Sequence, residues 1–261
     1  MLTRASPEFL LLRKFPTLNL DVLYEDNHCL VVNKPAGLLA QGDVTGDLSL
    51  VDLASSYLKT KYQKPGNVYV GLVHRLDRPT SGVVLLARTS KAASRLSAQF
   101  RAGSIEKIYH AVIDGSCPED AGEWNDTLWK DEERNVVRVV PPNTPGGQEA
   151  RLAFRVLGRF PRTTQLELRP ITGRSHQIRV QLAARGCPIV GDRKYGAVST
   201  LRMSDDRPRI ALHAQQLTFT HPTRGEVISI AAPVPTDWPV SWSEANPAMT
   251  GSSTPEAPPA Q

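Results

Sequence analysis

The chain has 261 residues, of which 40% are hydrophobic and 22% are charged, a composition that is ordinary for a folded globular protein. No apolar run approaches the roughly 18 residues that suggest a membrane span, which argues against a membrane protein. The three cysteines, Cys29, Cys117 and Cys187, are too few and too widely spaced for a disulfide framework or a metal-binding cluster. We therefore expect a cytoplasmic protein with no bound metal.

The net charge of +5 is unevenly distributed along the chain. Residues 151–209 contain 12 arginines and one lysine against four acidic residues, whereas residues 114–133 contain eight acidic residues and one lysine. This asymmetry predicts one surface that faces a polyanion and another that is turned away from it. A solvated surface without a partner is the alternative explanation.

Taken in chain order, the hydrophobic patterns predict two short strands, 22–25 and 29–33, and then an amphipathic helix over 50–62. A buried strand at 83–87 is followed by a helix over 90–101, with Ser90 as its N-cap and Gly103 beyond its end. A later helix over 175–185 is expected to begin at Ser175 and to end before Gly186. Further strands are predicted at 108–113, 136–140, 151–157, 165–168, 211–220 and 227–231.

Long strands and few helices predict an α+β fold with a mixed, mainly antiparallel sheet flanked by helices. We expect one domain over residues 21–240, preceded by an N-terminal extension over residues 1–20. Residues 241–261 form a predicted C-terminal tail, rich in proline, serine, threonine and alanine, which we expect to be disordered.

The most informative segment is His-Arg-Leu-Asp-Arg-Pro-Thr-Ser-Gly at 74–82, directly before the predicted buried strand. Asp77 stands between Arg75 and Arg78, and nearby positive charge favours the ionised form of a carboxyl group. Proline and glycine keep this segment out of regular structure. Such a carboxylate suits chemistry on a polyanion, although it could equally hydrogen-bond the backbone of its own turn.

Four further motifs accompany this segment. They are Asn-Lys-Pro-Ala-Gly at 33–37, Lys-Ile-Tyr-His-Ala-Val at 107–112, Arg-Pro-Ile-Thr-Gly-Arg-Ser-His-Gln-Ile-Arg at 169–179, and Gly-Cys-Pro-Ile-Val-Gly-Asp at 186–192 with Lys-Tyr-Gly at 194–196. In this order they resemble the motifs of the RluA-like family of pseudouridine synthases, over roughly residues 21–235. The small N-terminal RNA-binding domain of some family members is not expected here, because about twenty residues are too few for a domain.

The resemblance implies an enzyme that converts specific uridines of structured ribosomal or transfer RNA to pseudouridine. The base is flipped out of its stack, the bond between N1 and C1′ breaks, and C1′ rejoins to C5. The reaction is redox-neutral and transfers no group, so that no cofactor is expected. The sequence does not specify which RNA or which uridine is the substrate.

The resemblance assigns catalysis to Asp77, Tyr109 and Arg179. Asp77 could attack covalently or remove the 2′ proton of the ribose, and the sequence does not separate these routes. Arg179 would keep Asp77 ionised, and Tyr109 would lie against the target base. From the residues alone, Arg179 could instead be a surface arginine and Tyr109 a core residue.

Six residues are candidates for binding RNA: Lys34, His74, Arg75, Arg174, His176 and Gln177. Arg75 could fill the space left by the flipped base, since arginine stacks well on bases. The two histidines could instead be structural hydrogen-bond partners, and Lys34 could be a packing residue. We expect an RNA stem-loop as the partner, no obligate protein partner, and a monomer.

The alternative function is a non-catalytic RNA-binding protein, which would need a basic surface but no carboxylate at position 77. Other enzyme classes are disfavoured by missing motifs. The chain has no cysteine pair spaced as in zinc deaminases, no glycine-rich phosphate loop, and no Gly-x-Ser-x-Gly motif.

Overall fold

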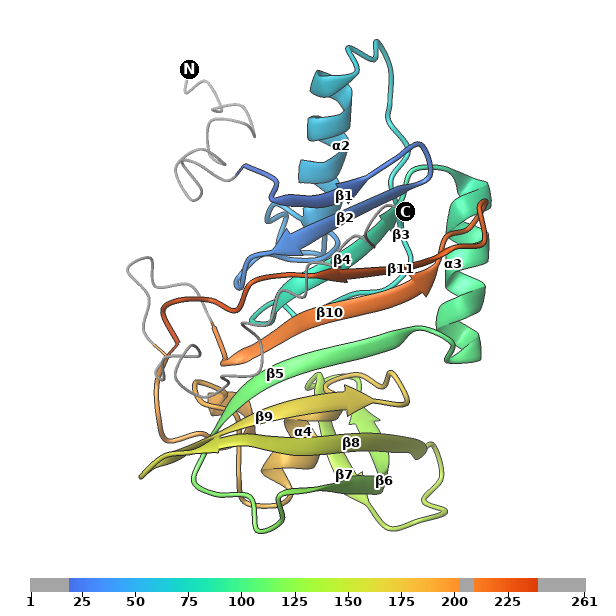
Figure 1. The fold of residues 1–261 in the computed structure, drawn as a ribbon. Coiled ribbons are helices and arrows are strands. Elements are labelled where there is room, and N and C mark those ends of the chain that lie inside the picture. The colour runs from blue at the N-terminus through green and yellow to red at the C-terminus, as the bar shows by residue number, and fades with distance from the viewer. Residues whose placement is uncertain (1–18, 202–208, 239–261) are drawn as a thin grey trace, which may run out of the picture.

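A computed structural model describes residues 19–201 and 209–238 of the chain (Figure 1). The predicted C-terminal tail, and all but the last two residues of the predicted N-terminal extension, lie outside these ranges. Both therefore stay predictions.

The described residues form one mixed sheet of 11 strands, whose main path runs β1-β2-β4-β10-β5-β9-β8-β6-β7 (Figure 1). β3 adds to β4, and β11 adds to β10. Within this sheet β4 and β10 are parallel, and the other neighbours are antiparallel. The predicted α+β fold is thereby confirmed. The strands are β1 (Val22–Glu25), β2 (Cys29–Lys34), β3 (Gly71–Leu72), β4 (Ser81–Ala87), β5 (Glu106–Asp114), β6 (Ala121–Asp131), β7 (Val136–Val140), β8 (Gln148–Arg159), β9 (Thr163–Pro170), β10 (Leu212–Thr220) and β11 (Val227–Ala231).

Helices α2 (Leu50–Lys61), α3 (Ser90–Ala102) and α4 (Gln177–Ala183) and the 3₁₀ turn η1 (Arg193–Tyr195) accompany the sheet. None of the helices in the described part of the chain is long and apolar enough to cross a membrane. α3 is capped by Thr89, whose side chain accepts a hydrogen bond from the amide of Ala92, so that the prediction of Ser90 as the cap is wrong by one residue. Gly103 ends α3 in the left-handed conformation, as predicted.

α4 is shorter than predicted, and Ser175 does not cap it. The N-cap is His176, which has left-handed backbone angles of φ 51° and ψ 18° and makes no side-chain cap. The turn before the helix is closed instead by Gln177, whose Oε1 accepts hydrogen bonds from Thr172 Oγ1 and the amide of Arg174. A side chain from inside the helix thus fixes the preceding turn, while the helix has no side-chain cap.

β6 was not predicted, and its position corrects the interpretation of the charge pattern. β6 carries acidic residues of the 114–133 segment and pairs with β8, which carries arginines of the 151–209 segment. Arg151 Nη2 therefore lies 2.7 Å from Glu123 Oε1. Arg185, which follows α4, places its Nη1 2.9 Å from Asp126 Oδ2. These ion pairs neutralise part of each segment, so the two segments do not form wholly separate charged surfaces as predicted.

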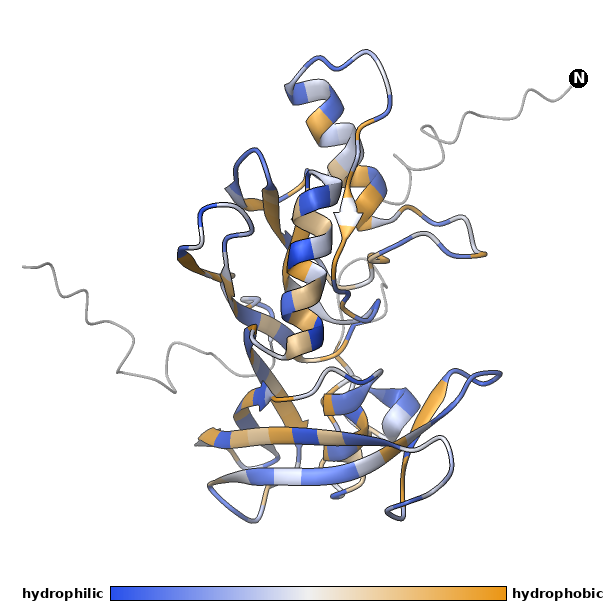
Figure 2. Ribbon diagram, turned by 90° about the vertical axis from the view of Figure 1, so that its right-hand side faces the viewer, coloured by the Kyte–Doolittle hydropathy of each residue, from blue (hydrophilic) through white to orange (hydrophobic). Residues whose placement is uncertain are grey.

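Three hydrophobic clusters build most of the core. α2 packs on one face of β2 and β4, while α3 packs on the other face of the same strands. α4 packs against β5, β8 and β9 in the second half of the sheet. Tyr109 on β5 contacts both the α2 and the α4 clusters, so it lies where the two halves meet. In Figure 2 the helices carry both hydrophobic and hydrophilic residues, as expected of helices with one buried face.

Candidate active site

A cleft of about 610 Å³ opens where the two halves of the sheet meet. Its walls come from the loop before β4, the end of α3, β5, the segment after β9 and the beginning of α4. The three predicted catalytic residues, Asp77, Tyr109 and Arg179, all line it. Segments more than 100 residues apart in the chain therefore converge on one cavity.

The loop that carries Asp77 is fixed to the sheet at its end. The carbonyl of Asp77 accepts a hydrogen bond from the amide of Thr80, which closes a turn at the beginning of β4. Gly82 then adopts φ +116°, and a Cβ atom there would lie 2.2 Å from the carbonyl oxygen of Ala214 on β10. Only glycine allows this close approach of the parallel strands, and the approach places the loop beside the cleft.

Arg179 projects from α4 and connects two carboxylates in the cleft wall. Its Nη1 donates to Asp77 Oδ2 at 2.9 Å, while Nε and Nη2 donate to the two oxygens of Asp192 at 2.7 and 2.8 Å. Burial alone would lower the pKa of Arg179, but the hydrogen bonds to Asp192 and the two negative charges outweigh it and raise the pKa. Arg179 is therefore a permanent cation held against Asp77.

Tyr109 lies on β5, opposite Leu168 on one side and Ala214 on the other. Burial, together with the charge of Asp77, raises the pKa of its hydroxyl above the ordinary value. The hydroxyl therefore stays protonated at neutral pH, and the ring forms an aromatic wall of the cleft.

His176 also faces Asp77, although it was predicted to bind RNA. Its Nε2 lies 3.8 Å from Asp77 Oδ2, and its Nδ1 lies 2.7 Å from the hydroxyl of Tyr195. Burial lowers its pKa, and the positive charge of Arg179 acts in the same direction, whereas the charge of Asp77 opposes them. The imidazole is therefore mainly neutral at pH 7.

Two of the predicted RNA-binding residues, Arg75 and Arg174, are exposed at the rim of the cleft. Arg174 is oriented by a hydrogen bond from its Nε to the carbonyl of Glu149 at 2.9 Å. Arg101 at the end of α3 and Lys107 on β5 also line the cleft, and neither was among the predicted RNA-binding residues. This rim can meet the phosphates of a polyanion.

Lys34 is fully buried and cannot contact RNA. Of the two roles considered from the sequence, RNA binding and packing, the structure therefore supports packing. Its ammonium donates to the carbonyls of Pro35, Leu38 and Arg78, the last at 3.3 Å. Because Arg78 follows Asp77 directly, Lys34 anchors the loop that carries the candidate catalytic carboxylate. Burial lowers the pKa of Lys34 to about 7.

His74 and Gln177 both make structural hydrogen bonds, and for the buried Gln177 this corrects the predicted RNA contact. His74 accepts the amide proton of Leu85 at 2.9 Å and stacks on Phe100, and burial lowers its pKa to about 3. Gln177 is 4% exposed, and its amide group bonds only the segments around it. Gln177 therefore has no group left for a phosphate, whereas the half-buried His74 lines the cleft, so that its predicted contact with RNA stays a prediction.

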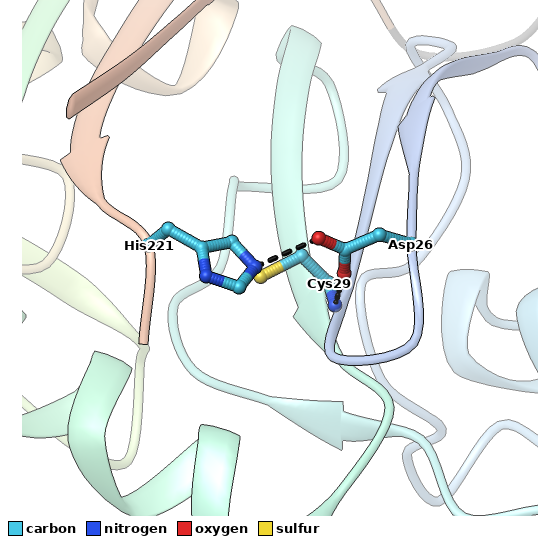
Figure 3. A group of neighbouring side chains, drawn as sticks. All are labelled: Asp26, Cys29 and His221. Atoms are coloured by element: carbon cyan, nitrogen blue, oxygen red, sulfur yellow. Dashed lines mark hydrogen bonds and ion pairs between the residues drawn. The ribbon is translucent and has the colours of Figure 1, made fainter. Parts of the chain in front are cut away.

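A possible metal-binding group was found by structure alone. Ligand atoms of Asp26, Cys29 and His221 lie within 4.8 Å of one another (Figure 3). Asp26 Oδ2 already accepts hydrogen bonds from His221 Nε2 at 2.7 Å and from the guanidinium of Arg224 at 2.9 Å. Burial raises the pKa of the Cys29 thiol to about 12. The guanidinium of Arg224, the proton on His221 Nε2 and the protonated thiol of Cys29 each disfavour binding of a metal ion. These residues therefore fit a structural cluster better than a metal site.

Comparisons with known proteins show the family of this chain. The profile of the RNA pseudouridylate synthase family matches residues 28–184. The chain is 38% identical over 218 residues to the dual-specificity RNA pseudouridine synthase RluA of Haemophilus influenzae, covering 82% of this chain and 92% of that protein. It is 34% identical over 215 residues to the ribosomal large subunit pseudouridine synthase C of Vibrio vulnificus, covering 82% of this chain and 65% of that protein.

Solved structures give the same result. The human RNA pseudouridylate synthase domain containing 4 superposes with a TM-score of 0.69 at 25% identity, covering 88% of this chain and 92% of that one. Fold, cleft and relatives together define an enzyme that acts on RNA. The chain belongs to the RNA pseudouridylate synthase family, and the resemblance found in its motifs is confirmed.

Proposed function

We propose that this enzyme isomerises particular uridines in stem-loops of ribosomal or transfer RNA, and that Asp77 begins the reaction. One observation carries the proposal. Arg179 holds Oδ2 of Asp77, whereas Oδ1 has no hydrogen-bond partner among the residues that the structure describes, and the side chain is 28% exposed to the cleft. A carboxylate with one oxygen anchored and the other unengaged is suited to react with a bound nucleotide.

The cleft is suited to a flipped nucleotide. Its volume of about 610 Å³ lies in the usual range for pockets that enclose small organic ligands. Because the bond to be broken is inaccessible in a stacked helix, the uridine must leave its stack to reach Asp77. The ring of Tyr109 offers a stacking surface for the uracil, and the arginines at the rim can hold the neighbouring phosphates.

The reaction then requires one bond to break and one to form, without any cofactor. Asp77 attacks the nucleotide, or takes the 2′ proton, and the bond between N1 and C1′ breaks. The uracil turns within the cleft, C1′ bonds to C5, and C5 loses its proton. Because the hydroxyl of Tyr109 stays protonated, Tyr109 serves to stack on the base and donate a hydrogen bond.

The relatives support ribosomal or transfer RNA as the substrate class, since one is named for the large ribosomal subunit and another for dual specificity. We further propose a cytoplasmic monomer without an obligate protein partner. The three cysteines are buried free thiols, which suits a reducing compartment. A purely RNA-binding role would leave the Asp77–Arg179 pair without a purpose, and charged pairs are costly to bury.

The test is chemical mapping of pseudouridine in total RNA from cells with and without this protein. Deletion should remove pseudouridine from one site or a few sites, and the wild-type chain should restore them. Asp77→Asn should restore none, whereas the matched variant Asp120→Asn should restore all, since Asp120 is an exposed partner of Arg159 outside the cleft. Restoration by Asp77→Asn, or an unchanged map after deletion, would contradict the proposal.

A further inference from the structure

We infer that Tyr195 fixes the tautomer of His176 so that His176 presents an N–H group to Asp77, which makes both of them positioning residues of the active site. The role follows from the proposed function of Asp77. It gives a purpose to the Lys-Tyr-Gly motif at 194–196, to which the sequence assigned none.

The hydrogen bonds of Tyr195 determine the direction of its contact with His176. The amide of Val137 donates to the Tyr195 oxygen at 3.0 Å, and His176 Nδ1 lies 2.7 Å from the same oxygen. An amide can only donate, so the proton of the hydroxyl must find an acceptor elsewhere. Among the described residues, His176 Nδ1 is the acceptor within hydrogen-bond distance of this oxygen. Tyr195 therefore donates to Nδ1.

A neutral imidazole has one donor and one acceptor nitrogen. Since Nδ1 accepts from Tyr195, the ring proton is on Nε2, the nitrogen that lies 3.8 Å from Asp77 Oδ2. The charged groups around the ring are Asp77, Asp192, Arg179 and Lys194, two of each sign. Burial and the cations keep His176 neutral against the attraction of the carboxylates.

The backbone aims the ring at this point. His176 occupies the N-cap of α4 at φ 51°, a left-handed conformation that residues other than glycine seldom adopt. Its side chain does not cap the helix, although its carbonyl accepts the amide of Val180, so the ring is free for another contact. The ring instead packs edge-on against Tyr195, with ring centres 5.7 Å apart.

The short turn η1 controls both groups that face Asp77 Oδ2. Asp192, directly before η1, holds Arg179 through two hydrogen bonds, and the Tyr195 ring lies 5.0 Å from the same guanidinium. The amide of Tyr195 in turn donates to the carbonyl of Asp192. One turn of chain thus positions Arg179 by a carboxylate and His176 by a hydroxyl.

The distance of 3.8 Å between Nε2 and Oδ2 is longer than a hydrogen bond. Catalytic hydrogen bonds are often long without substrate and shorten when it binds. With RNA in the cleft, His176 Nε2 becomes a second donor to Oδ2 beside Arg179 Nη1. Oδ1 then faces the nucleotide in a fixed orientation.

The direct test is ¹⁵N NMR of histidine-labelled protein without RNA, which reports the tautomer independently of any activity. His176 is one of six histidines, and its signals are those that disappear in His176→Gln. We expect the form with the proton on Nε2 in the wild type and a mixture of both neutral forms in Tyr195→Phe, which keeps the ring and removes the hydroxyl. A proton on Nδ1 in the wild type, or an unchanged tautomer in Tyr195→Phe, would overturn the inference.

Tritium release from RNA labelled at C5 of uridine gives the functional arm. Tyr195→Phe and His176→Ala should each lower kcat about tenfold, the effect of one lost hydrogen bond, with KM changed less than about twofold. His176→Gln, whose amide can place an N–H near the position of Nε2, should recover part of the loss.

In the His176→Gln background, Tyr195→Phe should cause little further loss, because no tautomer remains to be fixed. Tyr62→Phe is the matched control, since its hydroxyl bonds Glu25 outside the cleft. A multiplicative loss in the double variant would show that Tyr195 acts independently of His176 and would overturn the inference. Absence of turnover in every form, including the wild type, would instead count against the proposed function and leave the NMR result standing.

Discussion

Two clusters of this molecule contain the same four residue types but differ in what they can do. Each has an aspartate, an arginine, a histidine and a tyrosine. The cleft cluster lines or borders the cavity, whereas the turn cluster joins the β1–β2 turn to the β10–β11 turn. The members of the cleft cluster are Asp77, Arg179, His176 and Tyr195, and those of the turn cluster are Asp26, Arg224, His221 and Tyr24.

The difference lies in how the carboxylate is used. Asp26 accepts five hydrogen bonds, from two backbone amides and from the three other members of the turn cluster. Asp77 accepts one from a side chain, through Oδ2, and opens to a cavity through its other oxygen. Residue types alone therefore do not mark a reactive site. What marks the site here is a carboxylate oxygen without a hydrogen-bond partner among the described residues, next to a cavity that can hold a ligand.

The largest predicted contrast is between the two arginines. Arg179→Ala should lower kcat at least about 100-fold, because Asp77 loses the partner that orients it. Arg179→Lys should recover only part of the rate, since lysine lacks the planar fork that holds a carboxylate. Arg224→Ala should stay within about twofold of the wild type in the same tritium assay. A kcat for Arg179→Ala close to that of the wild type would remove the ion pair from the mechanism.

The aspartate of the turn cluster should matter for stability instead. Asp26→Asn should lower the free energy of unfolding by about 1–2 kcal/mol at pH 7, allowing for the partial exposure of the cluster. Burial alone would raise the pKa of Asp26, but the amides of His28 and Cys29 and the side-chain donors outweigh it and lower the pKa. Its stabilising effect is therefore complete above the unfolded pKa of about 3.9 and lost as the pH falls below that.

Urea unfolding at pH 7 and pH 3 measures this effect. The difference in free energy of unfolding between the wild type and Asp26→Asn should be smaller at pH 3 than at pH 7. A difference that is equal at both values would show that the charge of Asp26 is not what stabilises the turns.

Lys34 provides a pH test of the loop that carries Asp77. The pKa of Lys34 is lowered to about 7 by burial, so that the unfolded chain binds more protons than the folded chain between pH 7 and about 10.4. The free energy of unfolding of the wild type, compared with that of Lys34→Met, should therefore rise with pH across this window. The exposed Lys91→Met should show no such trend in urea unfolding at pH 7 and pH 9. An equal difference in free energy of unfolding between the wild type and Lys34→Met at both pH values would mean that Lys34 keeps its charge in the folded protein.

The smallest expected effect is that of metal removal. The turn cluster already uses its donors and acceptors internally, so EDTA should leave the melting temperature unchanged, and Zn²⁺ should not raise it. Turnover should also survive EDTA on an RNA whose own fold does not need magnesium. Loss of turnover that Zn²⁺ restores would show that a metal is part of the enzyme.

The hydrophobic periodicity predicted most strands of the sheet, because it is a local signal. The grouping of Asp77, Tyr109 and Arg179 in one site was implied by the family resemblance that the long motifs carry. Lys34 was misplaced, since nothing in a lysine within a loop indicates that three carbonyls enclose it. The tertiary pairing of β6 with β8, which brings acidic and basic residues of the two segments together, was also not predicted.

The roles of Asp192 and Tyr195 were also beyond the sequence. Their motif was recognised, but their contacts with Arg179 and His176 depend on where η1 packs against α4. A pattern of residues predicts which elements form. It does not predict which hydrogen bonds are left unmade, and those define the chemistry here.

The central claim is that the unengaged oxygen of Asp77 begins the isomerisation, and one paired measurement tests it. Tritium release from 5-tritiated uridine RNA should be measured for Asp77→Asn and Asp26→Asn, with RNA affinity measured in parallel. Asp77→Asn should lose turnover by about a thousandfold or more while its Kd for RNA stays within about twofold, because phosphate contacts supply most of the affinity. Folded Asp26→Asn should turn over like the wild type. Near-normal turnover in Asp77→Asn would contradict the account.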